Sequence, residues 1–387
     1  MQALTHDEYL SMRRLPALDG LRAVAALMVV AFHFGGPSWT WLSGWLGVHV
    51  FFVLSGFLIT TLSLREEDRK GHVSLRDFYL RRVFRIFPAY YVVLAISVAL
   101  AAVRDQYGSY APLLPYYLTF NNEFVGPAPF AHTWTLGIEQ KFYLVWPVLA
   151  FVIARASFGR RMGVTLAALA ILPVVVVFFQ NSPNGSWAVH YIAILLGCLM
   201  AILMHNPRGF ALVKPLTHPV IGLVACLVFI AVHLTIDPAM GWLAEHVSFT
   251  GKYKIVFGLY GIPVALLIPA LLGNGPARWA LSRPIMVYIG ERSYSLYLVQ
   301  YLGAFLAAAL VPQFGTYRTL TWIGVAIVSL LMADLIYRYV EQPMIALGRK
   351  VVNRKKPKST TDEPPADEPP AVDSPVEPIR VPAPAPA

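Results

Sequence analysis

The feature that most constrains this chain is a succession of apolar runs, each about 20 residues long. Such a run is long enough to cross a membrane as an α-helix, because the hydrocarbon core is about 30 Å thick. The candidates lie at residues 16–35, 44–64, 82–103, 138–156, 161–180, 187–205, 217–236, 254–273, 293–311 and 319–340. The sequence therefore predicts an all-α polytopic membrane protein with about ten transmembrane helices.

The composition excludes other common classes of protein. Of the 387 residues, 57% are hydrophobic and only 13% are charged, whereas a soluble domain has about 25% charged residues. So few charges cannot cover the surface of a soluble protein, and a disordered chain, a coiled coil and a collagen are excluded as well. Cys198 and Cys226 both lie in long apolar runs, which argues against a disulfide framework and a zinc site.

The Lys and Arg residues predict the topology. One set of alternate segments, which includes both termini, holds most of the 31 Lys and Arg residues. The opposite loops hold Arg104, Lys252, Lys254 and Arg318. Because positive charge collects on the cytoplasmic side, both termini are expected to be cytoplasmic and the number of spans even. This arrangement explains the net charge of +10 without nucleic-acid binding. No cleavable signal peptide is expected, because the first apolar run is too long for one.

Three regions are expected along the chain. Residues 1–15 form a cytoplasmic N-terminal segment, residues 16–345 form the membrane body, and residues 346–387 form a cytoplasmic tail. The start of the tail is basic, which fits an anchor on anionic lipid. From Pro357 onward it is rich in Pro and acidic residues, so we expect this part to be disordered.

Ionisable residues inside the apolar runs mark candidate functional sites, because they are costly in a membrane. Arg22 and His33 lie in the first run and are about 16 Å apart along a helix axis, close to three full turns. They therefore share a face and fit a polar track that is basic near the cytoplasm and titratable near the outer side. The alternatives are an arginine that extends to the interface and a histidine that only packs helices.

A second pair of candidates follows the most basic loop of the membrane body. Arg82 and Arg85 are three residues apart, so they face the same way on a helix. The arginine side chain is well suited to a bidentate grip on phosphate. The alternative is that these arginines only determine the membrane topology, although Arg85 already lies in apolar sequence.

Two glutamates lie at the ends of predicted helices. Glu139 begins an apolar helix after the long outer loop, where it either caps the helix or orients and charges His33. Glu341 closes the last run, where a helix stop with a partner such as Arg338 is the simplest explanation. Residues 111–120 of the outer loop are apolar but too short to span a membrane.

In combination, these residues resemble the acyltransferase-3 family of bacterial integral-membrane acyltransferases. The resemblance covers about residues 15–345 and rests on six motifs in order. They are Leu18-Asp19-Gly20-Leu21-Arg22 with His33; residues 47–60; Arg82, Arg85 and Pro88; Trp134-Thr135-Leu136 with Glu139 and Phe142-Tyr143-Leu144; Gly290 with Ser293-Tyr294 and residues 295–298; and Glu341 with Pro343.

The chain departs from the common pattern of the family at four positions. The family often has Asp where this chain has His49, and Glu and Gln where it has Gln140 and Lys141. It commonly has His in place of Gln300. Some members also carry an extracytoplasmic hydrolase-like domain, so the short tail here predicts a standalone form.

The resemblance implies transfer of an acyl group, usually acetyl, from cytoplasmic acyl-CoA to a hydroxyl of a cell-envelope sugar or glycolipid. The setting would be the bacterial cytoplasmic (inner) membrane. Arg22, Arg82 and Arg85 are the expected binding residues for the coenzyme phosphates, and His33 the general base with Glu139 as its partner. Acyl-CoA is then a co-substrate, and neither a permanently bound cofactor nor a metal is expected.

Three alternatives stay open. The acyl group could pass through a covalent acyl-His33. Intramembrane charges also line transport paths, so a proton-coupled transporter or exporter of an envelope precursor is the second. A non-catalytic envelope assembly protein, in which the polar residues only pack helices, is the third.

Overall fold

The computed structural model describes residues 2–155, 157–179, 183–313 and 318–353. The part of the tail that begins at residue 354, including the predicted disorder from Pro357, lies outside the described residues. Within the described ranges the chain is helical and contains no strand, which confirms the all-α prediction. The N-terminal segment packs onto the membrane body, because the guanidinium of Arg65 donates hydrogen bonds to the carbonyls of Tyr9 and Met12 at 3.1 and 2.6 Å.

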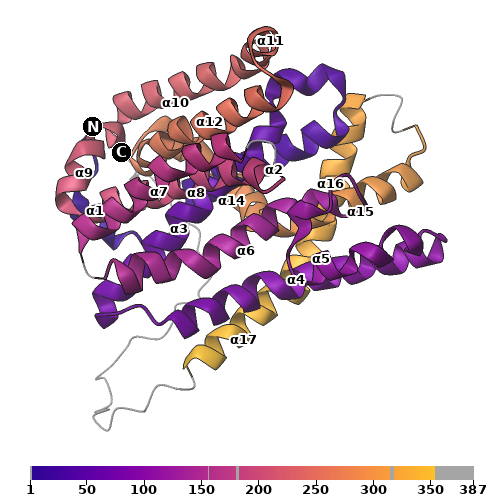
Figure 1. Cartoon of the computed structure of the whole chain (residues 1–387), viewed down its shortest axis with the longest axis horizontal. Coiled ribbons are helices and arrows are strands. Elements are labelled where there is room, and N and C mark those ends of the chain that lie inside the picture. The colour runs from indigo at the N-terminus through magenta and orange to yellow at the C-terminus, as the bar shows by residue number, and fades with distance from the viewer. Residues whose placement is uncertain (1, 156, 180–182, 314–317, 354–387) are drawn as a thin grey trace, which may run out of the picture.

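The helices follow the apolar runs of the sequence (Figure 1). They are α1 His6–Ser11, α2 Pro16–Phe34, α3 Gly47–Lys70, α4 Leu75–Val103, α5 Leu114–Leu118, α6 Trp134–Pro147, α7 Phe158–Phe178, α8 Pro183–His205, α9 Pro207–Val213, α10 Pro219–Leu234, α11 Ile236–His246, α12 Phe249–Leu272, α13 Pro276–Leu281, α14 Pro284–Glu291, α15 Ser293–Leu310, α16 Arg318–Ile336 and α17 Gln342–Asn353. Four short 3-10 turns lie in the stretch between α4 and α6, together with α5.

Nine helical segments of the described chain are long and apolar enough to cross a membrane, and a bent pair makes a tenth. The pair joins residues 207–217 to α10 at an angle of 78°. His218 is extended and caps α10, and Pro219 starts it, so the chain turns sharply there rather than continuing as one helix. The ten predicted spans are thus confirmed as a polytopic architecture, while the cytoplasmic location of the termini stays a prediction.

The last helix is longer than predicted, and the expected stop at Glu341 is wrong. A π-helical turn, Tyr337–Glu341, joins α16 to α17, and the helix continues to Asn353. Pro343 follows this turn and has no N–H to donate, so one helical hydrogen bond is missing next to the wider π turn. α17 then packs along α4 at one edge of the molecule (Figure 1).

The centre of the fold depends on close contact between the backbones of α3 and α8. A Cβ atom built on Gly56 would lie 1.9 Å from the carbonyl oxygen of Ile194, and one built on Gly197 would lie 1.9 Å from that of Val53. Small residues allow membrane helices to approach in this way, where packing rather than hydrophobicity holds them together.

Substitution of Gly56 by alanine should therefore destabilise the protein. The methyl group would overlap the α8 backbone, which cannot move without separating the helices, and we expect a loss of about 1–3 kcal/mol. The melting temperature of the detergent-purified protein should fall. Gly163→Ala is the matched control, because a Cβ atom at Gly163 meets nothing within 4 Å. Equal melting temperatures for the two variants would contradict this account of the helix contact.

Candidate active site

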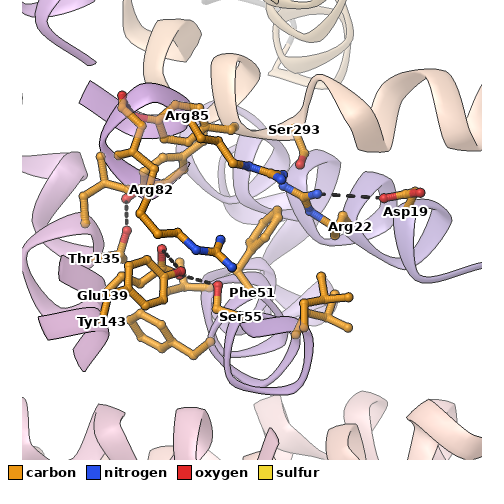
Figure 2. A pocket seen from close by; sticks show the side chains of 18 of the residues that line it. Asp19, Arg22, Phe51, Ser55, Arg82, Arg85, Thr135, Glu139, Tyr143 and Ser293 are labelled. Atoms are coloured by element: carbon orange, nitrogen blue, oxygen red, sulfur yellow. Dashed lines mark hydrogen bonds and ion pairs between the residues drawn. The ribbon is translucent and has the colours of Figure 1, made fainter. Parts of the chain in front are cut away.

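A cavity of about 280 Å³ lies between α2, α3, α4, α6 and α15 (Figure 2). It gathers most of the charged residues that the sequence places inside apolar runs. The polar and charged side chains around it are those of Asp19, Arg22, Ser55, Arg82, Arg85, Thr135, Glu139, Tyr143, Ser293, Tyr294 and Tyr297. His33, Trp134 and Glu341 are the candidate residues that do not line it.

Three guanidinium groups enter this cavity (Figure 2). Arg22 lies 3.8 Å from the carboxylate of Asp19, one helical turn away. Arg82 contacts the ring of Tyr143, with its guanidinium carbon 5.3 Å from the ring centre. Arg85 is exposed and forms neither a hydrogen bond nor an ion pair with any described residue. A cation that faces the cavity without a partner is available to an anionic ligand.

Other basic residues near the start of α4 are already paired. Glu66 binds both Lys70 and Arg81, each at 2.5 Å. Arg69 donates a hydrogen bond to the carbonyl of Arg65. Part of the positive charge in this region is therefore used in structural contacts, whereas Arg85 has no such partner among the described residues.

A second cavity, of about 180 Å³, adjoins the first. The two share Leu62, Arg82 and Arg85 as lining residues, and the second adds Arg81 and Arg349. Together they form a basic groove that extends from the centre of the bundle toward α17. Groups of this kind suit phosphate, which arginine binds through paired N–H donors.

Glu139 is held by neutral groups. It accepts hydrogen bonds from Ser55 at 2.8 Å and from Tyr143 at 3.1 Å (Figure 2). The predicted contact between Glu139 and His33 is not present, because the hydrogen bonds of the two residues go elsewhere. Glu139 instead supplies a carboxyl group to the wall of the cavity that Arg22 and Arg82 also line.

His33 is paired with Gln300 of α15. Its Nδ1 lies 3.0 Å from Oε1 of Gln300, whose Nε2 donates to the carbonyl of Tyr297 at 3.1 Å. This second bond fixes the orientation of the amide, so Nδ1 must be the donor to its oxygen. In a neutral ring, the lone pair then lies on Nε2, which is the arrangement that a general base needs.

We call the cavity lined by Arg22, Arg82 and Arg85 the arginine cavity. A layer of hydrogen bonds lies between it and His132. Tyr297 lines the cavity, accepts a hydrogen bond from Thr135 at 3.0 Å, and donates one to the backbone carbonyl of His132. Arg22 and His33 both face α15, as their spacing predicts, because Arg22 shares the cavity with Ser293 and His33 bonds Gln300. The two residues lie on opposite sides of Tyr297 along α15.

Comparison with known proteins assigns the family. The model of an acyltransferase domain, the acyltransferase-3 model, matches residues 15–338. The chain belongs to the acyltransferase-3 family. It is 28% identical over 373 residues to O-acetyltransferase OatA of Staphylococcus aureus, covering 89% of this chain and 59% of that protein. It is 27% identical over 382 residues to the Bacillus subtilis protein named "Putative peptidoglycan O-acetyltransferase YrhL", covering 89% of this chain and 57% of that protein.

The chain therefore spans less than two thirds of the length of these relatives. No solved structure gives a significant match. The described part of the chain also contains no group of three or more His, Cys, Asp or Glu side chains that could hold a metal ion.

The structure explains two positions where this chain departs from the common acyltransferase-3 pattern. Lys141 forms an ion pair with Glu123, in the loop that precedes α6, at 2.5 Å. Gln300 orients His33. Sequence reasoning missed both roles. Gln300 is seven residues after Ser293, so helical periodicity could have placed the two on one face of α15.

Two further candidate residues, Glu341 outside the cavity and Tyr294 in its wall, connect neighbouring elements. Glu341 accepts a hydrogen bond from Ser295. Its expected partner Arg338 instead binds Asp334 at 2.7 Å, so that expectation is wrong. The hydroxyl of Tyr294 donates to the carbonyl of Ile86 at 2.8 Å and ties α15 to α4 beside Arg85.

Trp134 packs away from the arginines. Its ring lies 4.8 Å from that of His190 and 5.2 Å from that of Trp187. His190 in turn shares a hydrogen bond with His49, with its Nδ1 3.1 Å from the Nε2 of His49. Trp134 thus anchors the start of α6, the helix that carries Glu139.

Loss of the Lys141 side chain should destabilise the protein. The side chain of Glu123 is only 2% exposed, so Lys141→Met would leave a buried carboxylate without its cation, at a cost of about 1–3 kcal/mol or more. The melting temperature of the purified variant should drop. The double variant Lys141→Met/Glu123→Gln should recover much of the loss, and an equally low value for both variants would refute the pairing.

Proposed function

We propose that this chain is an integral-membrane O-acyltransferase that moves an acetyl group from cytoplasmic acetyl-CoA to a hydroxyl of a cell-envelope carbohydrate. The observation that carries the proposal is the convergence of Arg22, Arg82 and Arg85 on one cavity, with Arg85 unpaired among the described residues. Membership of the acyltransferase-3 family supports it, and so does the name of the related OatA. The Lys and Arg bias supports a cytoplasmic opening in the bacterial inner membrane.

The basic groove is the proposed site for the coenzyme phosphates. Arg82 and Arg85 line both cavities, and Arg81 and Arg349 lie at the α17 end. Phosphates bound there would leave the thinner thioester arm to extend into the larger cavity, past Phe51 and Phe52. A concave site in which apolar side chains are combined with placed polar groups is typical of small-molecule binding.

His33 is the proposed general base. Its Nε2 accepts the proton of the acceptor hydroxyl while the oxygen attacks the thioester carbonyl, so that a C–O bond forms and the C–S bond breaks. The proton then passes to the departing thiolate, which leaves as the free thiol of the coenzyme. Gln300 acts as a positioning residue, because its bond to Nδ1 keeps the lone pair on Nε2.

Direct transfer is not the single route open to this arrangement. Nε2 of His33 could instead attack the thioester and carry the acetyl group to the acceptor in a second step. Ping-pong kinetics or a trapped acetylated His33 peptide would favour this route, and their absence would favour direct transfer.

The proposal predicts that His33→Ala loses acetyl transfer while the protein stays folded. A general base contributes about 10²–10⁴-fold to the rate. We would compare, by mass spectrometry, the acetyl content of envelope glycans in a strain lacking the protein and in strains restored with wild type, His33→Ala or His72→Ala. His72 is exposed, so its variant is the matched control. The acetyl mark should return with wild type and His72→Ala alone.

Two outcomes of this experiment would count against the proposal. A mark that also returns with His33→Ala would refute the role of the base. No change in any acyl mark would favour the transporter or the assembly protein, and flux of an envelope precursor would then be measured.

The proposed phosphate contact predicts a selective defect in Arg85→Ala. Loss of one charge-assisted contact of about 1.5–3 kcal/mol should raise the KM for acetyl-CoA about tenfold or more. It should barely change the KM for acetyl-pantetheine, which lacks the nucleotide phosphates. Arg76→Ala, at a side chain that is 51% exposed, should behave like wild type. Equal effects of Arg85→Ala on the two donors would exclude a phosphate contact.

A further inference from the structure

A separate cavity, of about 500 Å³, lies at the other end of α4. Arg104, the residue after the last turn of α4, is in its wall, together with residues of the 106–132 segment and of α15. Arg104 follows Arg85 by 19 positions, which corresponds to about 28 Å along a helix axis. This distance is close to the thickness of the hydrocarbon core, about 30 Å. The basic groove and this cavity, which we call the outer cavity, therefore lie near opposite faces of the membrane.

The lining of the outer cavity combines aromatic rings with a few polar groups. Tyr110, Phe130 and Tyr301 supply rings, and Gln106 and His132 supply hydrogen-bonding groups. Rings of this kind offer rigid apolar faces with a polar tip, which suit the C–H faces and hydroxyls of a sugar. A concave, mostly apolar site with few polar groups is the usual form of a ligand pocket.

Arg104 gives the cavity a cation. Its guanidinium carbon lies 4.7 Å from the centre of the Phe305 ring, and it forms no ion pair within the described ranges, including with the neighbouring Asp105. It is also one of the few basic residues on the side that the charge bias marks as outer, where Lys and Arg are disfavoured. An exposed guanidinium held against a ring is placed to bind a carboxylate or phosphate through two N–H donors.

The outer cavity is next to the proposed base. The ring of Tyr301 lies 4.6 Å from that of His132 and 5.4 Å from that of His33. On the other side, Tyr297 and Thr135 line the arginine cavity, and Tyr297 bonds the backbone of His132. A hydroxyl presented from the outer cavity at Tyr301 would thus meet His33 close to the layer formed by Tyr297.

We infer that the outer cavity binds the acceptor, and that this acceptor is a carbohydrate carrying an anionic group that Arg104 holds. The inference rests on the proposed function and adds the chemical class of the second substrate. The sugar ring packs on Tyr110 and Tyr301, the anion binds Arg104, and a free hydroxyl points toward Nε2 of His33. Arg104 binds the anion away from the reacting hydroxyl. It therefore selects acidic over neutral glycans without contacting the reacting atoms.

The test uses a cysteine placed in the cavity of the full chain in lipid nanodiscs. Ala128 lines the cavity, and both native cysteines are buried, so Ala128→Cys gives a thiol that a sulfonated maleimide can reach. Glucuronic acid should slow this labelling about tenfold more than its neutral methyl ester, because a charge-assisted contact is worth about 1.5–3 kcal/mol. Adding Arg104→Gln should remove the difference. Ser109→Cys, at an exposed residue outside the cavity, should show no protection.

Several results would overturn the inference. Equal protection by the acid and its ester, protection that survives Arg104→Gln, or equal protection by inorganic phosphate alone would exclude selection of an anionic carbohydrate. Acetyl-CoA binding to the same nanodiscs is measured in parallel. Normal acetyl-CoA binding with no sugar protection would refute the acceptor cavity alone, whereas absence of acetyl-CoA binding to the wild type would count against the proposed function.

Discussion

The cost of placing guanidinium groups inside a membrane governs this architecture. A central arginine on a membrane helix costs about 2.5–3.5 kcal/mol or more when it faces lipid, and Arg22, Arg82 and Arg85 all lie within spanning helices. The fold meets this cost by turning all three toward a polar cavity between α2, α4 and α15 (Figure 2). Close packing is kept for another part of the bundle, where α3 and α8 touch through Gly56 and Gly197.

Much of this arrangement follows from the sequence. The length of the apolar runs and the scarcity of charge determine a polytopic helical protein. Residues three or four positions apart are neighbours on an α-helix, which brings Arg82 and Arg85 to one face. The convergence of those residues with Arg22 and Glu139 could be expected because ionisable groups inside a membrane must share a polar space. These inferences need only local geometry and the cost of desolvation.

Other features depend on tertiary contacts that no local pattern encodes. Glu139 and His33 are suited to each other chemically, yet each finds a nearer partner, in Ser55 and in Gln300. The last helix continues because a π turn accommodates Pro343, where the residue type alone suggests a stop. The outer cavity is built partly from an irregular segment. Isolated hydrogen bonds fix this segment, such as the one from the Tyr90 hydroxyl to the Tyr117 carbonyl.

The layer formed by Tyr297 has a consequence for the cell as well as for chemistry. Cavities of about 280 and 500 Å³ reach toward it from the two sides, and water filling both would leave little apolar barrier across the bilayer. The hydroxyl of Tyr297, fixed by Thr135 and by the His132 carbonyl, breaks that path with a ring and two directed bonds. In the proposed reaction, the layer at which the two substrates meet would also limit the leak of protons that dissipates the electrochemical gradient of the membrane.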